Sequence, residues 1–247
     1  MLLPIIQNFI DKPIDPIYPR IVRDKDLETT DLQWLVGSDS DSPRSVGISP
    51  AYSQSGGLLA LACVFGTRTL IIKFHSSNAD HDSNSSRTQR QIRERHNRLE
   101  EGLLCNPHCT HYAFDLAPLA LSLHLHFNVH LANAIDIQSA LPVTSRDVID
   151  SVKFIIGDAF PFWVENITSA FEIKSNKEKD DLIALVQRAW LCHYLGQCDL
   201  GNVKDMFSIA PKVDVRVFSE QVSHLVRFIT REFSLHPFLR NLNFCKR

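Results

Sequence analysis

The sequence of 247 residues has no long apolar segment and no basic stretch at its amino terminus. Its longest apolar run, Gly57–Phe65, is far shorter than the roughly 20 residues that cross a bilayer. The first ten residues contain no Lys or Arg, which argues against a cleaved secretory signal. We therefore expect an intracellular protein, nuclear or cytoplasmic, that is not secreted and has no membrane partner.

A large net charge is also absent, because 26 basic residues face 28 acidic residues and the formal net charge is −2. This balance excludes a protein that attracts nucleic acid through an overall positive field, so any such contact requires a local basic surface. A hydrophobic content of 44% excludes disorder of the whole chain. The six cysteines are spread along the chain without a secretory signal, which predicts free thiols rather than a disulfide framework.

Proline is concentrated at the amino terminus, where four of the 12 prolines fall within the first 20 residues. Because proline breaks regular helix, residues 1–17 are expected to form an extended arm. Residues 18–247 are expected to form a single domain. Within it, residues 18–140 are the sheet-bearing part and residues 141–247 are the helical part.

Strand-like apolar runs separated by short polar turns dominate the first half of the chain. The run over residues 58–65 is apolar at nearly every position, which predicts burial on both faces. The predicted strands cover residues 45–52, 58–65, 69–74, 111–114 and 132–135, after a strand and short helix within 20–35. Helices are predicted over residues 87–104, 115–127, 180–195 and 215–235. The expected fold is α/β, with a mixed five-stranded sheet flanked by helices and a helical carboxy-terminal part.

Several segments of the first half also share a characteristic order. They are Tyr18–Leu27, Ser45–Ala51, Leu59–Val64, Thr69–Phe74, Thr110–Leu119 and Asn133–Ala140. Together they resemble the ribonuclease-D-like 3′–5′ exonuclease domains of the DEDD superfamily, and the resemblance covers residues 18–140. It implies a ribonuclease-H-like exonuclease fold.

The resemblance also implies an active site. Enzymes of this family hold two divalent metal ions, Mg²⁺ or Mn²⁺, on four acidic residues, and the metals activate water and stabilise the leaving oxygen of a phosphodiester. Two of these residues form an Asp-x-Glu on the first strand, which here falls on Ser49 and Ala51. The acidic positions that this sequence retains are Asp115 and Asp136, of which Asp136 matches a position that more often holds structure than metal.

The last acidic position of the family lies on a late helix. Here it falls on Cys198, or on Cys192 if the register begins at Arg188. One plausible ligand of four cannot hold two hard cations. We therefore expect a catalytically inactive protein without a cofactor, which acts as a nucleic-acid-associated or protein-interaction module.

Two alternatives remain open at this point. The first is an active metal-dependent exonuclease with a rearranged acidic set of Asp39, Asp41, Asp115 and Asp136, which would require Mg²⁺ or Mn²⁺. Asp39 and Asp41 are flanked by Ser, Gly and Pro, however, and such flanks favour a loop over a strand. The second alternative is a scaffold protein without a role in nucleic-acid binding.

The strongest candidate for recognition is a local basic helix over residues 87–98. Its arginines are Arg87, Arg90, Arg93, Arg95 and Arg98. Arginine suits phosphate because its planar fork donates two parallel hydrogen bonds. The alternative is a solvated helix in which Glu94, Glu100 and Glu101 pair with these arginines at helical spacing.

A second cluster, of Cys105, His108, Cys109 and His111, contains side chains that bind metals. Zinc ligands, however, normally come as two spaced pairs. We therefore interpret this segment as a loop with a buried thiol.

Overall fold

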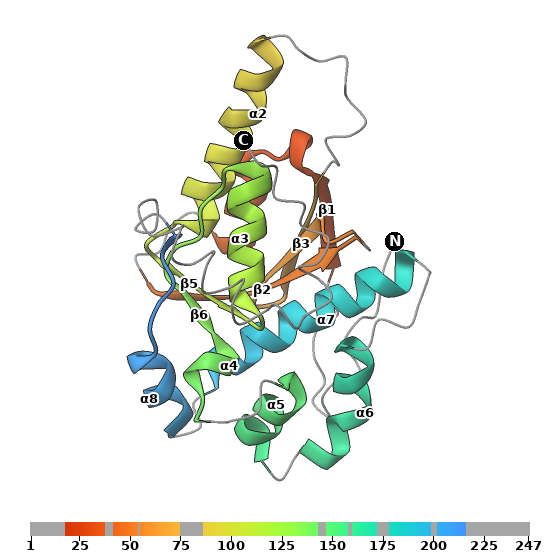
Figure 1. Ribbon diagram of the computed structural model, residues 1–247, viewed down its shortest axis with the longest axis vertical. Coiled ribbons are helices and arrows are strands. Elements are labelled where there is room, and N and C mark those ends of the chain that lie inside the picture. The colour runs from red at the N-terminus through yellow and green to blue at the C-terminus, as the bar shows by residue number, and fades with distance from the viewer. Residues whose placement is uncertain are drawn as a thin grey trace.

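The computed structural model describes residues 18–37, 42–53, 55–74, 86–142, 147–157, 160–171, 178–198 and 202–215. A six-stranded mixed sheet lies at the centre of this part of the chain (Figure 1). Side by side, the strands are β1 (Tyr18–Arg23), β4 (Arg68–Lys73), β3 (Leu58–Phe65), β2 (Arg44–Tyr52), β5 (Cys109–Ala113) and β6 (Ala134–Asp136). Strands β2, β3 and β4 are antiparallel neighbours, whereas β5 is parallel to β2, β6 to β5 and β1 to β4.

The mixed α/β sheet agrees with the prediction, but it has six strands rather than five. The sixth strand is β1, which corresponds to the strand predicted at the start of residues 20–35 but not counted in the sheet; it lies at the edge and pairs with β4. Parallel neighbours need a long connection and leave no hairpin signal in the sequence, so this pairing was not predictable from turn lengths. An ion pair of 2.6 Å between Arg20 and the buried carboxylate of Asp31 ties β1 to α1 (Thr29–Val36).

Seven further α-helices follow α1 in the described part of the chain. They are α2 (Ser86–Leu99), α3 (Leu116–Phe127), α4 (Ile137–Ala140), α5 (Val148–Ile156), α6 (Phe160–Phe171), α7 (Glu178–Gln197) and α8 (Asn202–Ile209). A 3₁₀ turn, η1 (Asp24–Asp26), precedes α1, and a π-helical turn, η3 (Glu100–Leu104), extends α2. The arm predicted over residues 1–17 and residues 216–235 of the last predicted helix lie outside the described residues.

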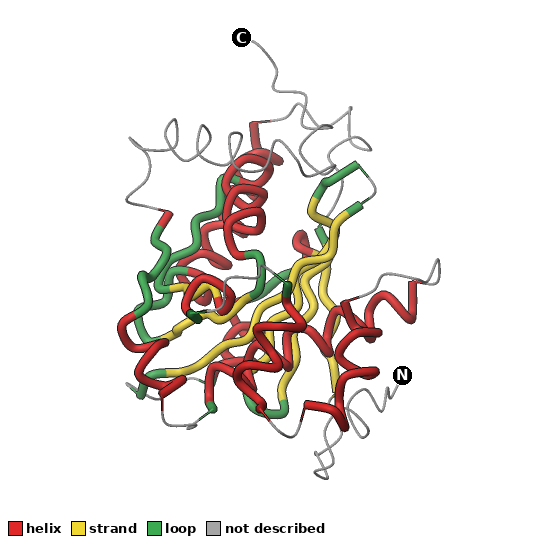
Figure 2. The backbone as a smooth tube through the Cα atoms, turned by 60° about the horizontal axis from the view of Figure 1, so that its bottom comes forward, coloured by secondary structure: helices red, strands yellow, loops and turns green. Residues whose placement is uncertain are grey.

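Helices cover both faces of the sheet (Figure 2). Alternate residues of β3 supply the two cores, since Ala60, Ala62 and Val64 pack with α5, α6 and α7, whereas Leu61 and Cys63 pack with α1, α3 and η3. This division follows from the two-residue period of a strand. The predicted burial of β3 on both faces is confirmed, except at Leu59, which is 45% exposed.

The long helix α7 lies unusually close to β2. The residues of β2 that face α7 are small: Ser45, Gly47, Ser49 and Ala51. A Cβ atom on Gly47 would lie 2.0 Å from the carbonyl oxygen of Ala189, so only glycine permits this approach. His193 fixes the register, because its Nδ1 lies 2.8 Å from the Ser45 carbonyl oxygen and its Nε2 accepts a hydrogen bond from the Gly66 N–H at 2.9 Å. The helix backbone therefore sits directly over the strand that carries the first predicted site positions.

No helix in the described part of the chain has both the length and the apolar character needed to cross a membrane.

Candidate functional site

The carboxyl ends of three neighbouring strands meet at one edge of the sheet. Strand β2 ends at Tyr52, Asp115 follows β5 after one residue, and Asp136 is the last residue of β6. Because these strands are mutually parallel, the residues that follow them are brought together. The backbone N–H of Asp115 donates a hydrogen bond of 3.3 Å to Oε1 of Gln138, which links the ends of β5 and β6. Two of the predicted acidic positions are therefore neighbours.

Asp115 occupies the position before α3, as the sequence pattern predicts, but its side chain makes no capping hydrogen bond. Its backbone is left-handed, with φ 52° and ψ 50°, a conformation that is uncommon outside glycine but is enriched in Asp and Asn. The side chain is exposed. The chain thus turns sharply here and presents a carboxylate at the sheet edge.

Asp136 has a structural role at the start of α4. Its Oδ1 accepts a hydrogen bond of 3.0 Å from the backbone N–H of Gln138 and caps the helix. Burial raises the pKa of this carboxyl, the backbone N–H groups of Ser139 and Gln138 oppose the shift, and the negative charge of Asp115 raises the pKa further. The Asp115 carboxylate thus lies near enough to Asp136 to affect its charge.

The space beside Ser49 is occupied by an arginine from α7. The guanidinium of Arg188 donates from Nε to the Ser49 hydroxyl at 3.2 Å and from Nη2 to the Pro50 carbonyl oxygen at 3.3 Å. Its Nη1 donates to the carbonyl oxygen of Ala170 at 3.2 Å. Ala170 lies in the last turn of α6, where backbone carbonyls lack partners within the helix. The single cation of Arg188 therefore joins β2, at the predicted site position Ser49, to the end of α6.

Cys192 lies one turn further along α7 and is almost completely buried. Burial raises the pKa of its thiol to about 12, a hydrogen bond with the backbone of Phe114 lowers it, and the charges of Arg188 and Asp136 act in opposite directions. These interactions place Cys192 among Arg188, Asp136 and the end of β5. A thiol held in its neutral form is a poor ligand for a hard cation.

The two registers predicted for the late-helix position, Cys198 and Cys192, lead to different places in the structure. Cys198 follows the end of α7 and lines a cavity together with Thr110 and Tyr112 of β5. Thr110 pairs with Ser45 at the start of β2, four residues before Ser49. The late-helix residue beside Asp136 is Cys192, the position given by the other register. Counting from Tyr194 or His193 alone could not distinguish the two registers.

The described residues contain no group of three His, Cys, Asp or Glu side chains that could hold a metal ion. In the cluster near residue 109, Cys109 and His111 are buried in the core. Burial lowers the pKa of His111 to about 4, which keeps the imidazole neutral. The predicted buried thiol is Cys109, but this residue and His111 belong to strand β5 rather than to a loop. Asp39 and Asp41 lie outside the described residues, and β2 begins at Arg44.

The predicted basic helix is α2, which projects from the body of the molecule (Figure 1). Arg90 pairs with Glu94 at 2.9 Å, and Arg98 donates to the backbone carbonyls of Glu94 and Leu27 at 3.4 and 3.5 Å. Arg93 is exposed and Arg95 is half-buried. The side chain of Arg87 lies outside the described part of the chain. The pairing of Arg90 with Glu94 agrees with the solvated-helix interpretation, whereas phosphate recognition stays a prediction.

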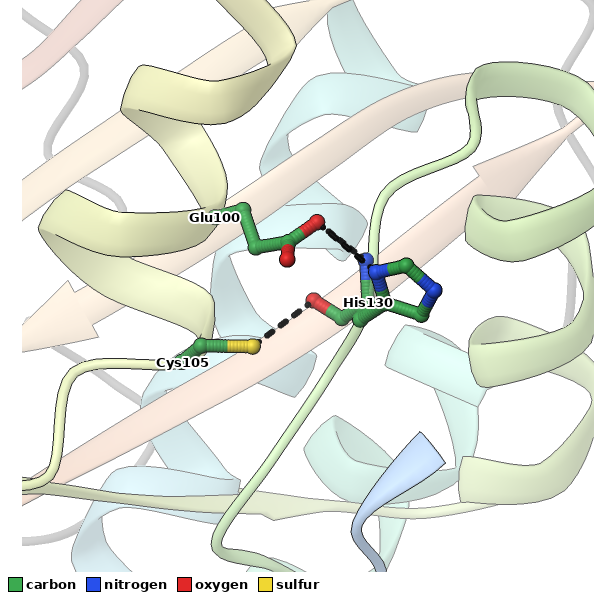
Figure 3. A network of polar contacts seen from close by, with 3 residues as sticks. All are labelled: Glu100, Cys105 and His130. Carbon is green, nitrogen blue, oxygen red and sulfur yellow. Dashed lines mark hydrogen bonds and ion pairs between the residues drawn. The ribbon is translucent and has the colours of Figure 1, made fainter. Parts of the chain in front are cut away.

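The base of α2 is anchored by a polar network that the sequence did not indicate (Figure 3). Oε2 of Glu100 accepts a hydrogen bond from the backbone N–H of His130 at 2.9 Å and lies 3.0 Å from its Nδ1. The Cys105 thiol approaches the carbonyl oxygen of His130 at 3.5 Å. The network joins η3 to the segment before β6 and so fixes the origin of the projecting helix.

Arg188 is the site residue that the sequence analysis missed as a functional side chain. The sequence does contain a signal for this role. Leu185 and Cys192, three residues before and four residues after Arg188, are apolar and buried, so Arg188 is a cation within a buried helical stripe. On the same helix Val186, Ala189 and Trp190 are buried in the core, and Ile183 is half-buried. Comparison with known proteins adds no assignment, because neither a protein-family model nor a curated protein matches this sequence.

Proposed function

We propose that this chain is a degenerate 3′–5′ exonuclease-like protein that lacks catalytic activity and acts as a nucleic-acid-associated or protein-interaction module. The observation that carries the proposal is the position of Arg188, whose guanidinium contacts the Ser49 hydroxyl and the Pro50 carbonyl oxygen. In an active member of the family, the carboxylate at the Ser49 position would bind a divalent metal at this place.

The topology of the sheet supports the first part of the proposal. Five strands, in the order β4-β3-β2-β5-β6, form an antiparallel hairpin series followed by parallel neighbours. This is the kind of mixed five-stranded sheet that a ribonuclease-H-like exonuclease domain implies, and β1 extends it at the edge. Asp115 and Asp136 come together at the carboxyl edge, where ligand sites of such sheets are usually found.

Electrostatics support the loss of catalysis. Two unit positive charges at about 4 Å repel each other by about 4 kcal/mol near a protein surface, and a divalent ion doubles this value. A metal beside Ser49 would therefore face strong repulsion from Arg188, without the two first-strand carboxylates that would attract it. Cys192, on the late helix, offers a neutral buried thiol in place of a third carboxylate.

The arginines of α2 support contact with nucleic acid. The exposed pair of Arg90 with Glu94 is worth only about 0.3–0.5 kcal/mol in a helix, so a phosphate competes with it easily. Arg93 already faces solvent, and the helix extends beyond the body of the protein (Figure 1). A projecting cationic helix can approach a phosphate backbone without rearrangement of the fold.

Catalysis is tested with the purified full chain and end-labelled single-stranded DNA and RNA, in the presence of Mg²⁺ or Mn²⁺. We expect no shortening of either substrate. Metal-dependent shortening that disappears in Asp115→Ala would overturn the proposal and would favour the rearranged acidic set of Asp39, Asp41, Asp115 and Asp136.

Binding is tested by fluorescence anisotropy of labelled single-stranded oligonucleotides over a series of salt concentrations. Each phosphate contact contributes about 0.7 to the slope of log K against log salt for single strands, so Arg93→Gln should reduce the slope by about this amount. Lys153→Gln, on the exposed surface of α5, is the matched control and should leave the slope unchanged. No binding at low salt would remove the nucleic-acid role and favour a protein scaffold.

A further inference from the structure

Two histidines meet near the base of α2, away from the carboxyl edge of the sheet. His124 lies in the last turn of α3, and His130 lies in the segment that leads from this helix to β6. Because a helix rises about 1.5 Å per residue, His124 lies about 13 Å along the chain from Asp115 at the candidate site. The His130 side chain is 24% exposed and His124 is half-buried, so small ions from solvent can reach the pair.

Glu100 holds the His130 ring in one orientation. Its Oε2 accepts a hydrogen bond from the backbone N–H of His130 at 2.9 Å and lies 3.0 Å from Nδ1 of the same residue. Figure 3 shows Nδ1 directed at the carboxylate and the second ring nitrogen, Nε2, turned away from it. A carboxylate only accepts hydrogen bonds, so Nδ1 carries the proton of the neutral ring and the lone pair of Nε2 stays available.

His124 presents a ring nitrogen without a partner. Its Nδ1 is buried and makes no hydrogen bond within the described part of the chain. A buried polar atom of this kind normally binds a protein group, a water or an ion. The charges that act on this ring are those of His130 and Glu100, so a cation beside it would meet a carboxylate and no lysine or arginine among them.

The separation of the two rings suits a shared metal ion. Imidazole nitrogens bind Zn²⁺ at about 2.0–2.1 Å in tetrahedral geometry, which places the centroids of two rings on one ion about 5 Å apart. The centroids of His124 and His130 are 5.2 Å apart, and the rings are tilted by 43° to each other. The contact between Glu100 and His130 also has the form found at metal sites, where a carboxylate accepts the N–H of a ligating imidazole.

We propose that His124 and His130 bind one divalent transition-metal ion such as Zn²⁺, with Glu100 as a positioning residue. Nε2 of His130 and Nδ1 of His124 would be the ligands. Water would complete the coordination, since the described residues provide no group of three ligands. Imidazole favours Zn²⁺, Cu²⁺ and Ni²⁺ over Mg²⁺ and Ca²⁺.

The ion would join the end of α3 to the segment before β6, which Glu100 already ties to the base of the projecting helix α2. The proposal concerns a separate site. It does not depend on the loss of exonuclease activity or on contact of α2 with nucleic acid.

The test is isothermal titration of the metal-free full chain with Zn²⁺. We expect His124→Gln and His130→Gln each to bind one Zn²⁺ fewer than the unaltered protein. His126→Gln is the matched control, because His126 is exposed two residues along the same helix and so faces another direction. It should bind as the unaltered protein does. Binding of Zn²⁺ to thiols contributes equally to all four proteins and cancels in the comparison.

The role of Glu100 is tested with Glu100→Gln, which retains an acceptor for His130 and removes the charge. Its affinity for Zn²⁺ at this site should fall about tenfold or more. The urea midpoint measured in EDTA reports any purely structural effect separately, because no metal is bound under that condition.

His124→Gln leaves the contact between Glu100 and His130 intact, so its circular dichroism spectrum should match that of the unaltered protein. Zn²⁺ should raise the urea midpoint of the unaltered protein by more than that of this variant, since an ion that binds the folded state stabilises it. The proposal is overturned if the two histidine variants bind as many Zn²⁺ ions as the unaltered protein. It is equally overturned if Mg²⁺ in equal concentration displaces Zn²⁺ from the site.

Discussion

Arg188→Met tests directly whether the arginine beside Ser49 is an integral part of the fold. Methionine retains an unbranched side chain of similar reach and removes the guanidinium. The substitution leaves the hydroxyl of the buried Ser49 and the carbonyl oxygens of Pro50 and Ala170 without this donor.

The expected magnitude follows from these three contacts. A hydrogen bond from a charged group contributes about 1.5–3 kcal/mol when buried, but Arg188 is only half-buried and water can replace part of what is lost. All three donor-to-acceptor distances are 3.2–3.3 Å, at the long end of the normal range. We therefore expect the free energy of unfolding to fall by about 2–3 kcal/mol, the scale of breaking a buried polar network.

The assay is urea denaturation followed by circular dichroism, with Arg93→Met as a matched control. Arg93 is exposed on α2, so its substitution should change the stability by no more than about 0.5 kcal/mol. Arg188→Lys should be intermediate, because an ammonium cannot reproduce the planar fork. Equal unfolding midpoints for Arg188→Met and Arg93→Met would refute the view that a cation holds β2, α6 and α7 together at this place.

Three further predictions concern the core. Gly47→Ala should destabilise the protein by about 3 kcal/mol, because the new methyl group meets the Ala189 backbone. In Gly102→Ala the methyl group meets only the flexible end of the Leu32 side chain, so the loss of stability should be smaller. Comparison of the urea midpoints of the two variants tests this order. Burial lowers the pKa of His111 in the folded protein from 6.5 to about 4. The stability that the neutral imidazole allows is therefore fully present above pH 6.5, and on the order of 3 kcal/mol of it is lost as the pH falls towards 4. Unfolding midpoints measured across this range should fall less steeply in His111→Phe. Burial raises the pKa of the Cys63 and Cys192 thiols, so mass spectrometry after alkylation at pH 8 should find both unmodified in the folded protein and modified in urea; labelling of the folded protein at either residue would contradict their burial.

The strands and the larger helices were predictable because their signals are local. The alternation of apolar residues, the hairpin-sized separators and the helical spacing in α7 each depend on neighbouring residues. The partner of β1 was not predictable in this way, because a parallel pairing across the intervening α1, β2 and β3 leaves no local signal. The same applies to the bridge between Ala134 and Val213, which joins two segments far apart in the sequence.

The candidate site shows the same limit at the level of single residues. Its acidic positions Asp115 and Asp136 were predicted from the resemblance to the exonuclease family, whose blocks lie within continuous segments of the sequence. The different surroundings of Cys192 and Cys198, by contrast, depend on the packing of α7 on β2, and that packing is set by the absence of a side chain at Gly47. A glycine in a strand normally signals weak packing, so its meaning here emerged only once the helix was placed over it.

The small residues of β2 and the cation of α7 are physically linked. With an aspartate at position 49 and a glutamate at position 51, α7 would approach two carboxylates, and an arginine at 188 would neutralise them and displace the metals they bind. With Ser49 and Ala51 instead, the helix can approach closely, and the arginine finds uncharged acceptors in a hydroxyl and two carbonyl oxygens. The small residues of the strand and the arginine of the helix therefore form one arrangement. Introducing carboxylates at positions 49 and 51 alone would create ion pairs with Arg188 rather than a metal site.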